Sequence, residues 1–398
     1  MNVERSRPER AWARIDLGRI SSNLDHARRS LPNKKILAVV KADAYGHGAT
    51  AISKQLEKDG IDYLGVGTSG EAIDLRNDGI TAPILVLGAL LPTELPEVID
   101  RNITVTIHSP GRITELESLA KIKNQKIPVH LLIDTGMARL GVSTRNALDH
   151  AKRIEASPWL ELEGLGTHIA TPGDDQQVNL QRSLFRTITS DLEQCGIRPP
   201  LIHVDASHSA ITANAGESTM VRLGGWIYGI VAGLAGSSPV SPALSLFSQI
   251  VYLRDHPEGR PIGYGGTFVT RRQSRLATIS IGYHDGLPTT LSNKGELLVR
   301  GQRVPVVGRV TMDYTTVDVT DVPGVSVGDL VTLLGTDGSE EIAAKEIAAW
   351  CGLVPYEVTC LLGRRILRIP VTKDGFWPEI GEDESQIAEG EKIGRAHV

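Results

Sequence analysis

A lysine stands where a short apolar run ends, in the segment VVKADAYGHG at residues 39–48. Burial disfavours the charged form of an amine and so lowers the pKa of a lysine. A lysine at the end of a buried strand can therefore act as a base, or form a Schiff base with a carbonyl-bearing cofactor. Alternatively, the lysine side chain extends from the strand end into solvent and has no chemical role. Lys41 is the first candidate for chemistry.

The residues that follow Lys41 suit a phosphate group. The hydroxyl of Tyr45 can bond a phosphate, and Gly46 and Gly48 permit close approach of the backbone. They precede a predicted helix, whose first turn stabilises anions. Carbonyl-bearing cofactors such as pyridoxal phosphate use a lysine to form a Schiff base.

Eight apolar runs rich in Val, Ile and Leu occur before residue 226, with amphipathic segments such as 49–60 and 111–124 between them. Short continuous runs are typical of strands buried on both faces of a parallel sheet. Eight strand–helix units in roughly 220 residues predict a (β/α)8 barrel, with its active site at the C-terminal ends of the strands. Lys41 lies at such an end. The runs are 36–40, 63–67, 84–88, 103–107, 129–133, 162–169, 201–207 and 220–225.

The pattern changes after about Leu234, at the Gly/Ser/Pro-rich join AGSSPVSPALS. Strand-like runs follow at 276–283, 296–308, 314–322 and 329–335, with hairpin signals at RGQR (300–303) and TDGSE (336–340). The fold class predicted is therefore α/β, a TIM-type barrel followed by a mainly β C-terminal domain. We place the cofactor-binding barrel at 15–235, the mainly β domain at 1–14 and 236–380, and a flexible acidic tail at 381–398.

Composition excludes several classes of partner. A net charge of -5 provides no broad basic field, so a nucleic acid is not expected as a partner. The odd number of cysteines, three, has spacings that suggest neither a disulfide framework nor a zinc site, so we expect no metal and a reducing compartment. Without a signal-like N-terminus or a long apolar run, the chain is expected to be cytoplasmic, with no membrane partner.

VVKADAYGHG resembles the cofactor-lysine segment of the alanine racemases, pyridoxal phosphate enzymes built from a barrel and a β domain. The resemblance runs from WARIDLGRISSNL (12–24) to YEVTC (356–360). It implies a racemase that interconverts L-alanine and D-alanine for peptidoglycan, with Lys41 carrying the cofactor. It also implies a second base on the opposite face of Cα, Tyr264 in IGYGGTF (262–268). The family's active site is shared between two subunits, so a homodimer is implied.

Three further segments resemble the family's cofactor and substrate segments. In DTGMARLGV, Arg139 would reach the cofactor's phenolic oxygen and the substrate carboxylate, and in GLGTHIAT, His168 would pack beside the pyridine ring. In VRLGGWIYG, Arg222 would bond the pyridine nitrogen. An arginine leaves that nitrogen unprotonated, which favours racemisation over transamination. On spacing alone, Arg139 also fits a surface arginine and His168 a purely structural histidine. Arg222 also fits an arginine at the end of a core strand.

The remaining site residues follow from the same resemblance. Without it, Tyr264 between two glycines also reads as a turn residue. The backbone N–H of Met312 would bind the substrate carboxylate, and Tyr283 would line the entrance. The cofactor phosphate would be bound by Tyr45, Ser209, Gly224, Gly225 and Arg364.

Three positions depart from the family pattern. Leu132 stands where many members carry a carbamylated lysine, His208 replaces an asparagine in HVDASHSA, and Arg364 replaces a tyrosine. The substrate therefore stays open between alanine, serine and a broader range. Rival classes are a noncatalytic pyridoxal phosphate-binding protein, a decarboxylase of related architecture and a Schiff-base aldolase. The large β domain with Tyr264 argues against the first, and the phosphate-type residues argue against the aldolase. The lysine and cysteine segments of the decarboxylase family are not found.

Overall fold

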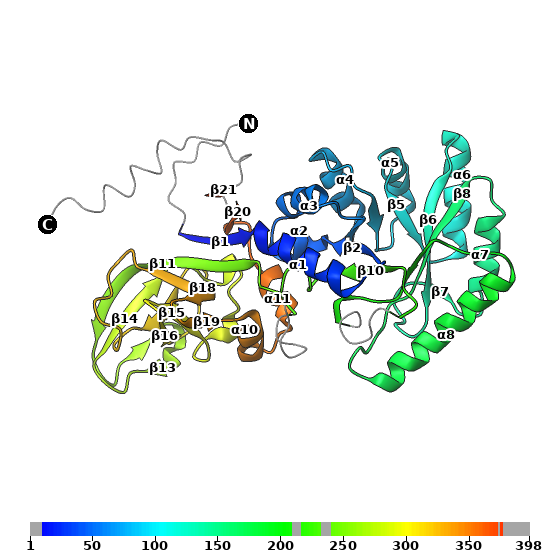
Figure 1. Cartoon of the computed structure of the whole chain (residues 1–398). Coiled ribbons are helices and arrows are strands. Elements are labelled where there is room, and N and C mark those ends of the chain that lie inside the picture. The colour runs from blue at the N-terminus through cyan, green and yellow to red at the C-terminus, as the bar shows by residue number, and fades with distance from the viewer. Residues whose placement is uncertain (1–9, 209–215, 232–239, 373–374, 377–398) are drawn as a thin grey trace.

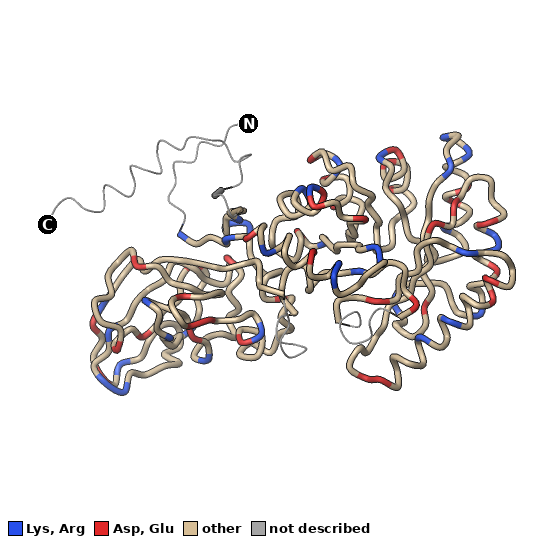
Figure 2. The backbone as a smooth tube through the Cα atoms, in the orientation of Figure 1, with Lys and Arg blue, Asp and Glu red and all other residues tan. Residues whose placement is uncertain are grey.

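The computed structural model describes residues 10–208, 216–231, 240–372 and 375–376. A barrel and a mainly β domain lie beside each other, joined by β1 and β11 (Figure 1). Lys and Arg are interspersed with Asp and Glu over both domains in the described part of the chain (Figure 2). Among the described helices, none combines the length and the apolar content that a membrane span needs.

The eight predicted barrel strands are confirmed. They are parallel, in the order β10-β2-β3-β4-β5-β6-β8-β9, and a parallel bridge between Ala206 and Arg222 brings the two ends of the row together. Every residue of β3, β4, β5 and β10 is buried, because helices cover the outer face and side chains fill the interior. The strands are β2 (Lys35–Val39), β3 (Tyr63–Val66), β4 (Ile84–Val86), β5 (Thr104–Ile107), β6 (Ile127–Asp134), β8 (Leu160–Gly166), β9 (Leu201–His203) and β10 (Met220–Leu223), with the short β7 (Val142–Ser143) beside β6.

Helices alternate with these strands, as the amphipathic segments predict. The 111–124 segment forms α6, and Asn124 ends it in the left-handed conformation, with φ of 49°. Thr68 and Glu71 form a capping box at the start of α4. The helices are α1 (Leu17–Ser30), α2 (Lys41–Gly46), α3 (Ala49–Lys58), α4 (Ser69–Asn77), α5 (Leu95–Asp100), α6 (Pro110–Lys123), α7 (Ala147–Glu155) and α8 (Asp175–Gln194).

The second domain is mainly β, as predicted. The RGQR signal forms the turn of a hairpin, in which Arg300 and Gly301 both adopt positive φ, 52° and 72°. The strands are β1 (Ala11–Asp16), β11 (Leu244–His256), β12 (Pro261–Ile262), β13 (Phe268–Val269), β14 (Ser274–Ile279), β15 (Glu296–Val299), β16 (Gln302–Pro305), β17 (Thr315–Asp318), β18 (Leu330–Asp337), β19 (Glu340–Ile342), β20 (Leu367–Thr372) and β21 (Gly375–Phe376). Two helices, α10 (Ala344–Cys351) and α11 (Pro355–Cys360), accompany them.

The chain's first described strand belongs to the second domain. β1 lies between β11, which is antiparallel to it, and β20, which is parallel. The sheet is therefore built from both ends of the chain. The predicted domain boundary at 235 and the predicted tail at 381–398 lie outside the described residues, so they stay predictions.

Candidate active site

Lys41 and Arg222 come from neighbouring strands. β10 pairs with β2 in parallel register, so Lys41, two residues beyond β2, and Arg222, within β10, lie toward the same end of the barrel. The lysine is exposed, and its side chain passes Gly67, where an added Cβ would lie 3.6 Å from the lysine Cβ. Because Gly67 has no side chain, the lysine chain has room to reach the barrel mouth.

The turn after Lys41 is left-handed. The four residues Ala42–Tyr45 have φ between 52° and 55°, a conformation that costs each L-residue roughly 1–2 kcal/mol. Two carboxylates hold it, one from outside the turn and one within it. Glu71 accepts the backbone N–H of Ala42 at 2.6 Å, and Asp43 accepts the backbone N–H of Ala49 at 2.7 Å. The right-handed helix that the sequence predicts after Gly48 begins at Ala49.

Two tyrosines face the glycines that follow β10, Tyr45 at Gly224 and Tyr356 at Gly225. A Cβ added to Gly224 would lie 2.8 Å from the Tyr45 hydroxyl, and one added to Gly225 would lie 2.6 Å from the Tyr356 ring. Any side chain would therefore clash at either position. Burial, with Tyr356 nearby, raises the pKa of Tyr45, so its hydroxyl keeps its proton and can donate to an anion.

The serine beside these glycines is Ser207. Its Oγ accepts the backbone N–H groups of Gly224 at 3.1 Å and Trp226 at 3.3 Å. The predicted phosphate residue, Ser209, lies outside the described residues and stays a prediction. Both serines belong to HVDASHSA, and the sequence alone does not show which of them contacts the backbone after β10. In the structure β9 ends at His203, and Ser207 lies four residues beyond that end.

Arg222 is buried, and five acceptors take the N–H groups at the two ends of its guanidinium. Nη1 donates to the ring Nδ1 of His203 at 2.6 Å and to the His203 carbonyl; Nη2 donates to the carbonyls of Thr167 at 2.8 Å and Val204 at 3.1 Å and to His168 Nδ1 at 3.1 Å. No partner for Nε is found among the described residues. Burial lowers the pKa of Arg222 to about 10, so it is a cation at neutral pH with one N–H to offer.

The pKa of His168 reflects burial and three nearby cations at this end of the barrel. Burial, Arg222, Arg139 and Lys41 together lower the pKa of His168 to about 3, so the ring is neutral and can accept from Arg222. A neutral histidine among cations leaves this end of the barrel strongly positive. Such a site suits a ligand that carries a phosphate and a carboxylate.

The loop that carries Arg139 is fixed by Asp134. The carboxylate accepts the backbone N–H groups of Gly136 at 2.9 Å and Ala138 at 3.1 Å. Arg139 itself is exposed, and none of the described residues forms an ion pair or hydrogen bond with its side chain. Leu132, half-buried in β6, has no group that could orient it.

Arg364 follows α11, the helix that packs beside α2. Its side chain is exposed, and within the described part of the chain we find no ion pair or hydrogen bond for it. The next residue differs: Arg365 pairs with Asp285 at 2.8 Å and Asp313 at 2.7 Å. Arg364 is therefore available to a ligand, as its predicted role requires.

Tyr283 and Met312 lie together in the second domain. The backbone of Tyr283 donates to Thr311 at 2.9 Å, and the next residue donates to Met312 at 3.2 Å. Tyr264 lies between Gly263 and Gly265 in the β12–β13 hairpin, and 74% of it is exposed. That hairpin belongs to the domain opposite the barrel (Figure 1), so one chain alone does not bring Tyr264 to Lys41.

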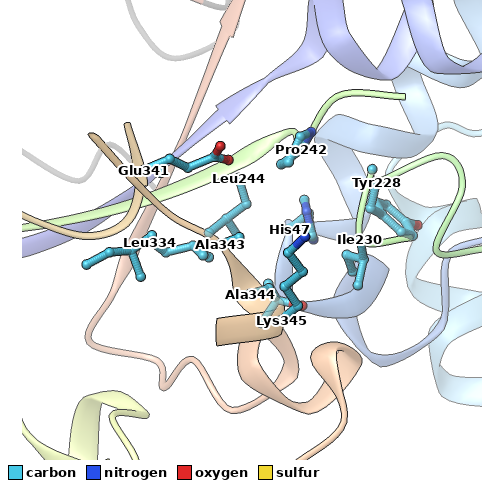
Figure 3. Close-up of a pocket in the computed structure, with 14 residues that line it drawn as sticks. His47, Tyr228, Ile230, Pro242, Leu244, Leu334, Glu341, Ala343, Ala344 and Lys345 are labelled. Carbon is cyan, nitrogen blue, oxygen red and sulfur yellow. The ribbon is translucent and has the colours of Figure 1, made fainter. Parts of the chain in front are cut away.

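A cavity lies at the junction of the two domains (Figure 3). Its lining includes His47, Tyr228, Leu334, Glu341 and Lys345. Among the described residues, neither Lys41 nor any of the three arginines assigned to the site lines it. The cavity therefore belongs to the domain junction and not to the barrel mouth.

Two family models match most of the chain. The model for "Alanine racemase, N-terminal domain" matches residues 15–232, and the model for "Alanine racemase, C-terminal domain" matches residues 243–370. The chain belongs to the alanine racemase family. Its two matched segments correspond to the barrel and to the mainly β domain.

Alanine racemases of other organisms match along nearly their whole length. The alanine racemase of Methanococcus maripaludis is 38% identical over 365 residues, which cover 90% of this chain and 98% of that protein. The structure of the Clostridium difficile 630 alanine racemase superimposes with a TM-score of 0.85 at 31% identity, covering 94% of this chain and 98% of that one. The Bartonella henselae alanine racemase, solved with covalently bound pyridoxal phosphate, has a TM-score of 0.83 at 28% identity, covering 92% and 100%.

The residues at the barrel mouth fit this family's cofactor, pyridoxal phosphate. A lysine amine is at hand for the aldehyde, and Arg222 has one N–H without a partner among the described residues for the ring nitrogen. The Tyr45 hydroxyl beside Gly224 is a donor for a phosphate, and Gly224 and Gly225, which have no side chains, leave space for it. Ser207 is a candidate phosphate residue that the sequence analysis missed.

Proposed function

We propose that this protein is a pyridoxal phosphate-dependent alanine racemase in which Lys41 holds the cofactor. The observation that carries the proposal is the position of Lys41 and Arg222 on neighbouring strands, with one N–H of the arginine left over by the described residues. We assign the phosphate to Tyr45, Ser207 and the backbone N–H of Gly225, and the substrate carboxylate to Arg139. Gly224 serves the phosphate by having no side chain, because its N–H donates to Ser207.

The reaction needs a base on each face of Cα. When bound, pyridoxal phosphate accepts electrons from the bond between Cα and its proton, which makes that proton acidic. In one direction the neutral amine of Lys41 would remove the proton on one face, and the hydroxyl of Tyr264 of the partner subunit would return one on the other. In the reverse direction the Tyr264 phenolate would remove the proton, and the Lys41 ammonium would return one. Arg222 stays charged at neutral pH, so it holds the ring nitrogen without protonating it.

A homodimer supplies the second base in this proposal. Tyr264, Tyr283 and Met312 are exposed apolar or aromatic residues of one domain, with exposed fractions of 74%, 45% and 51%. Large apolar side chains that gather on a surface favour association. We infer that this surface faces the barrel mouth of a second copy, where Met312 would offer its N–H to the substrate carboxylate.

Chiral chromatography of L-alanine incubated with the protein and pyridoxal phosphate tests the function. We expect D-alanine, in clear excess over the D-serine formed from L-serine in a parallel reaction. L-Serine is included because Arg364, an exposed cation after α11, replaces a tyrosine of the family pattern, which leaves a polar substrate open. Lys41→Ala protein is the control and should form neither product. Absence of D-alanine from a cofactor-loaded dimer would contradict the proposal. The use of the D-alanine in peptidoglycan is part of the proposal.

A further inference from the structure

A line of hydrogen bonds crosses the inside of the barrel and ends at Arg222. The hydroxyl of Tyr63 donates to Glu163 Oε1 at 2.5 Å, and Glu163 Oε2 lies 3.2 Å from His130 Nε2. His130 Nδ1 lies 2.9 Å from His203 Nε2, and His203 Nδ1 lies 2.6 Å from Arg222 Nη1. The five side chains come from five different strands: β3, β8, β6, β9 and β10.

The direction of every bond is determined by the two ends. A guanidinium only donates, so His203 Nδ1 must accept from Arg222, and the proton of the His203 ring must be on Nε2. That N–H donates to His130 Nδ1, which places the proton of His130 on Nε2, where the Glu163 carboxylate accepts it. The reverse direction would set an N–H of His203 against an N–H of Arg222. Both histidines are therefore neutral and carry their proton on Nε2.

Burial and charge keep these protonation states at neutral pH. Both histidines are fully buried, and burial lowers the pKa of each. The charge of Arg222 lowers the pKa of His203 further, whereas in His130 burial outweighs the bond and charge of Glu163, which raise the pKa. Burial alone would raise the pKa of Glu163, but hydrogen bonds from His130 and Tyr63 outweigh it and hold that pKa below its usual value. Burial and the bond to Glu163 raise the pKa of Tyr63. The line therefore runs from an ionised carboxylate through two neutral rings to a cation.

We propose that Glu163 is a positioning residue for Arg222. By accepting from His130, its carboxylate completes the line and keeps the bare Nδ1 of His203 toward the arginine. The guanidinium is then held in one orientation, with its Nε–H left for the cofactor ring. This inference rests on the proposed function, because it takes Arg222 as the residue that contacts the ring nitrogen.

Without the carboxylate, the N–H of His130 has no acceptor in a buried position. A buried donor without a partner is costly, so the His130 ring turns or shifts its proton, and its bond to His203 is lost. His203 is then free to move, and Arg222 loses its shortest ring contact. A loosened arginine holds the ring nitrogen less firmly, which should allow protonation there and with it more transamination.

Neutron diffraction from a crystal of the deuterated holoenzyme tests the protonation states directly. We expect deuterium on Nε2 and none on Nδ1 of both His130 and His203. Deuterium on Nδ1 of either ring would overturn the inference. This measurement does not depend on turnover, so it decides the point even if the protein does not racemise alanine.

The partition between racemisation and transamination tests the role of Glu163. In Glu163→Leu protein we expect transamination per racemisation to rise about tenfold, the change that one hydrogen bond to a charged group supports. Glu163→Gln keeps an oxygen that accepts from His130 and should stay near the wild-type ratio. Glu161→Leu removes an exposed carboxylate from the same strand and is the matched control. Equal ratios in the Glu163→Leu, Glu163→Gln and Glu161→Leu proteins would overturn the positioning role.

Discussion

Replacement of Gly46 by alanine should destabilise the turn that carries Lys41. Gly46 has φ of 80°, which costs an L-residue roughly 1–2 kcal/mol. A Cβ there would lie 2.0 Å from the carbonyl oxygen of Thr359, in α11, so the two backbones must move apart. Forced overpacking of this kind costs about 1–3 kcal/mol. We therefore expect Gly46→Ala to lower the free energy of unfolding by about 2–5 kcal/mol.

Gly79→Ala is the matched control, because Gly79 has a similar φ of 86° and nothing lies within 4 Å of an added Cβ. It should cost only the conformational part, about 1–2 kcal/mol. Urea denaturation followed by tryptophan fluorescence measures both, since Trp226 is buried in the barrel. Equal losses in the two variants would refute the contact between Gly46 and Thr359 as the source of the additional cost.

Three other outcomes follow from the site. Lys41→Ala should abolish the visible absorbance of the lysine-bound cofactor, and colour that survives would mean that another lysine holds it. Tyr264→Phe should suppress exchange of the Cα proton in solvent far more for one alanine enantiomer than for the other, whereas an equal loss for both would remove it as a face-specific base. Burial lowers the pKa of His47 from 6.5 to about 4. The unfolded chain then binds the extra proton first, so the free energy of unfolding should fall as the pH drops through that window. The share of His47 in that fall should be roughly 3 kcal/mol, measured by urea titration at each pH as the difference between the wild-type and His47→Gln proteins. The other buried histidines add to the fall in both proteins, and identical slopes would argue against a contribution from His47.

Strands buried on both faces appear in the sequence as short continuous apolar runs, and this is why the barrel was predictable. Each apolar run, such as 84–88, needs no partner to be recognised as a strand. β11 is different: its buried residues give way to partly exposed ones along 13 residues, and no turn residue divides it. β1 is short, and only its long-range pairing with β11 and β20 makes it part of the sheet.

Residues of the site were predictable where a segment is continuous, and less so where contacts are distant. Lys41, Tyr45 and the glycines after β10 follow from two short segments. Ser207 needs the neighbouring backbone of Gly224 to be recognised. Glu163 could not be predicted from spacing, because its importance comes from His130, 33 positions away in the chain.

The place of β1 has a consequence for synthesis of the protein on the ribosome. This strand is made before both of its neighbours in the sheet, because β11 follows the barrel segment and β20 follows β11 and the strands after it. Contacts over such separations form slowly, and an unpaired strand edge invites association with other chains. The barrel segment is therefore complete before β1 has a strand to pair with. Both edges of β1 are paired only after β20 has been made.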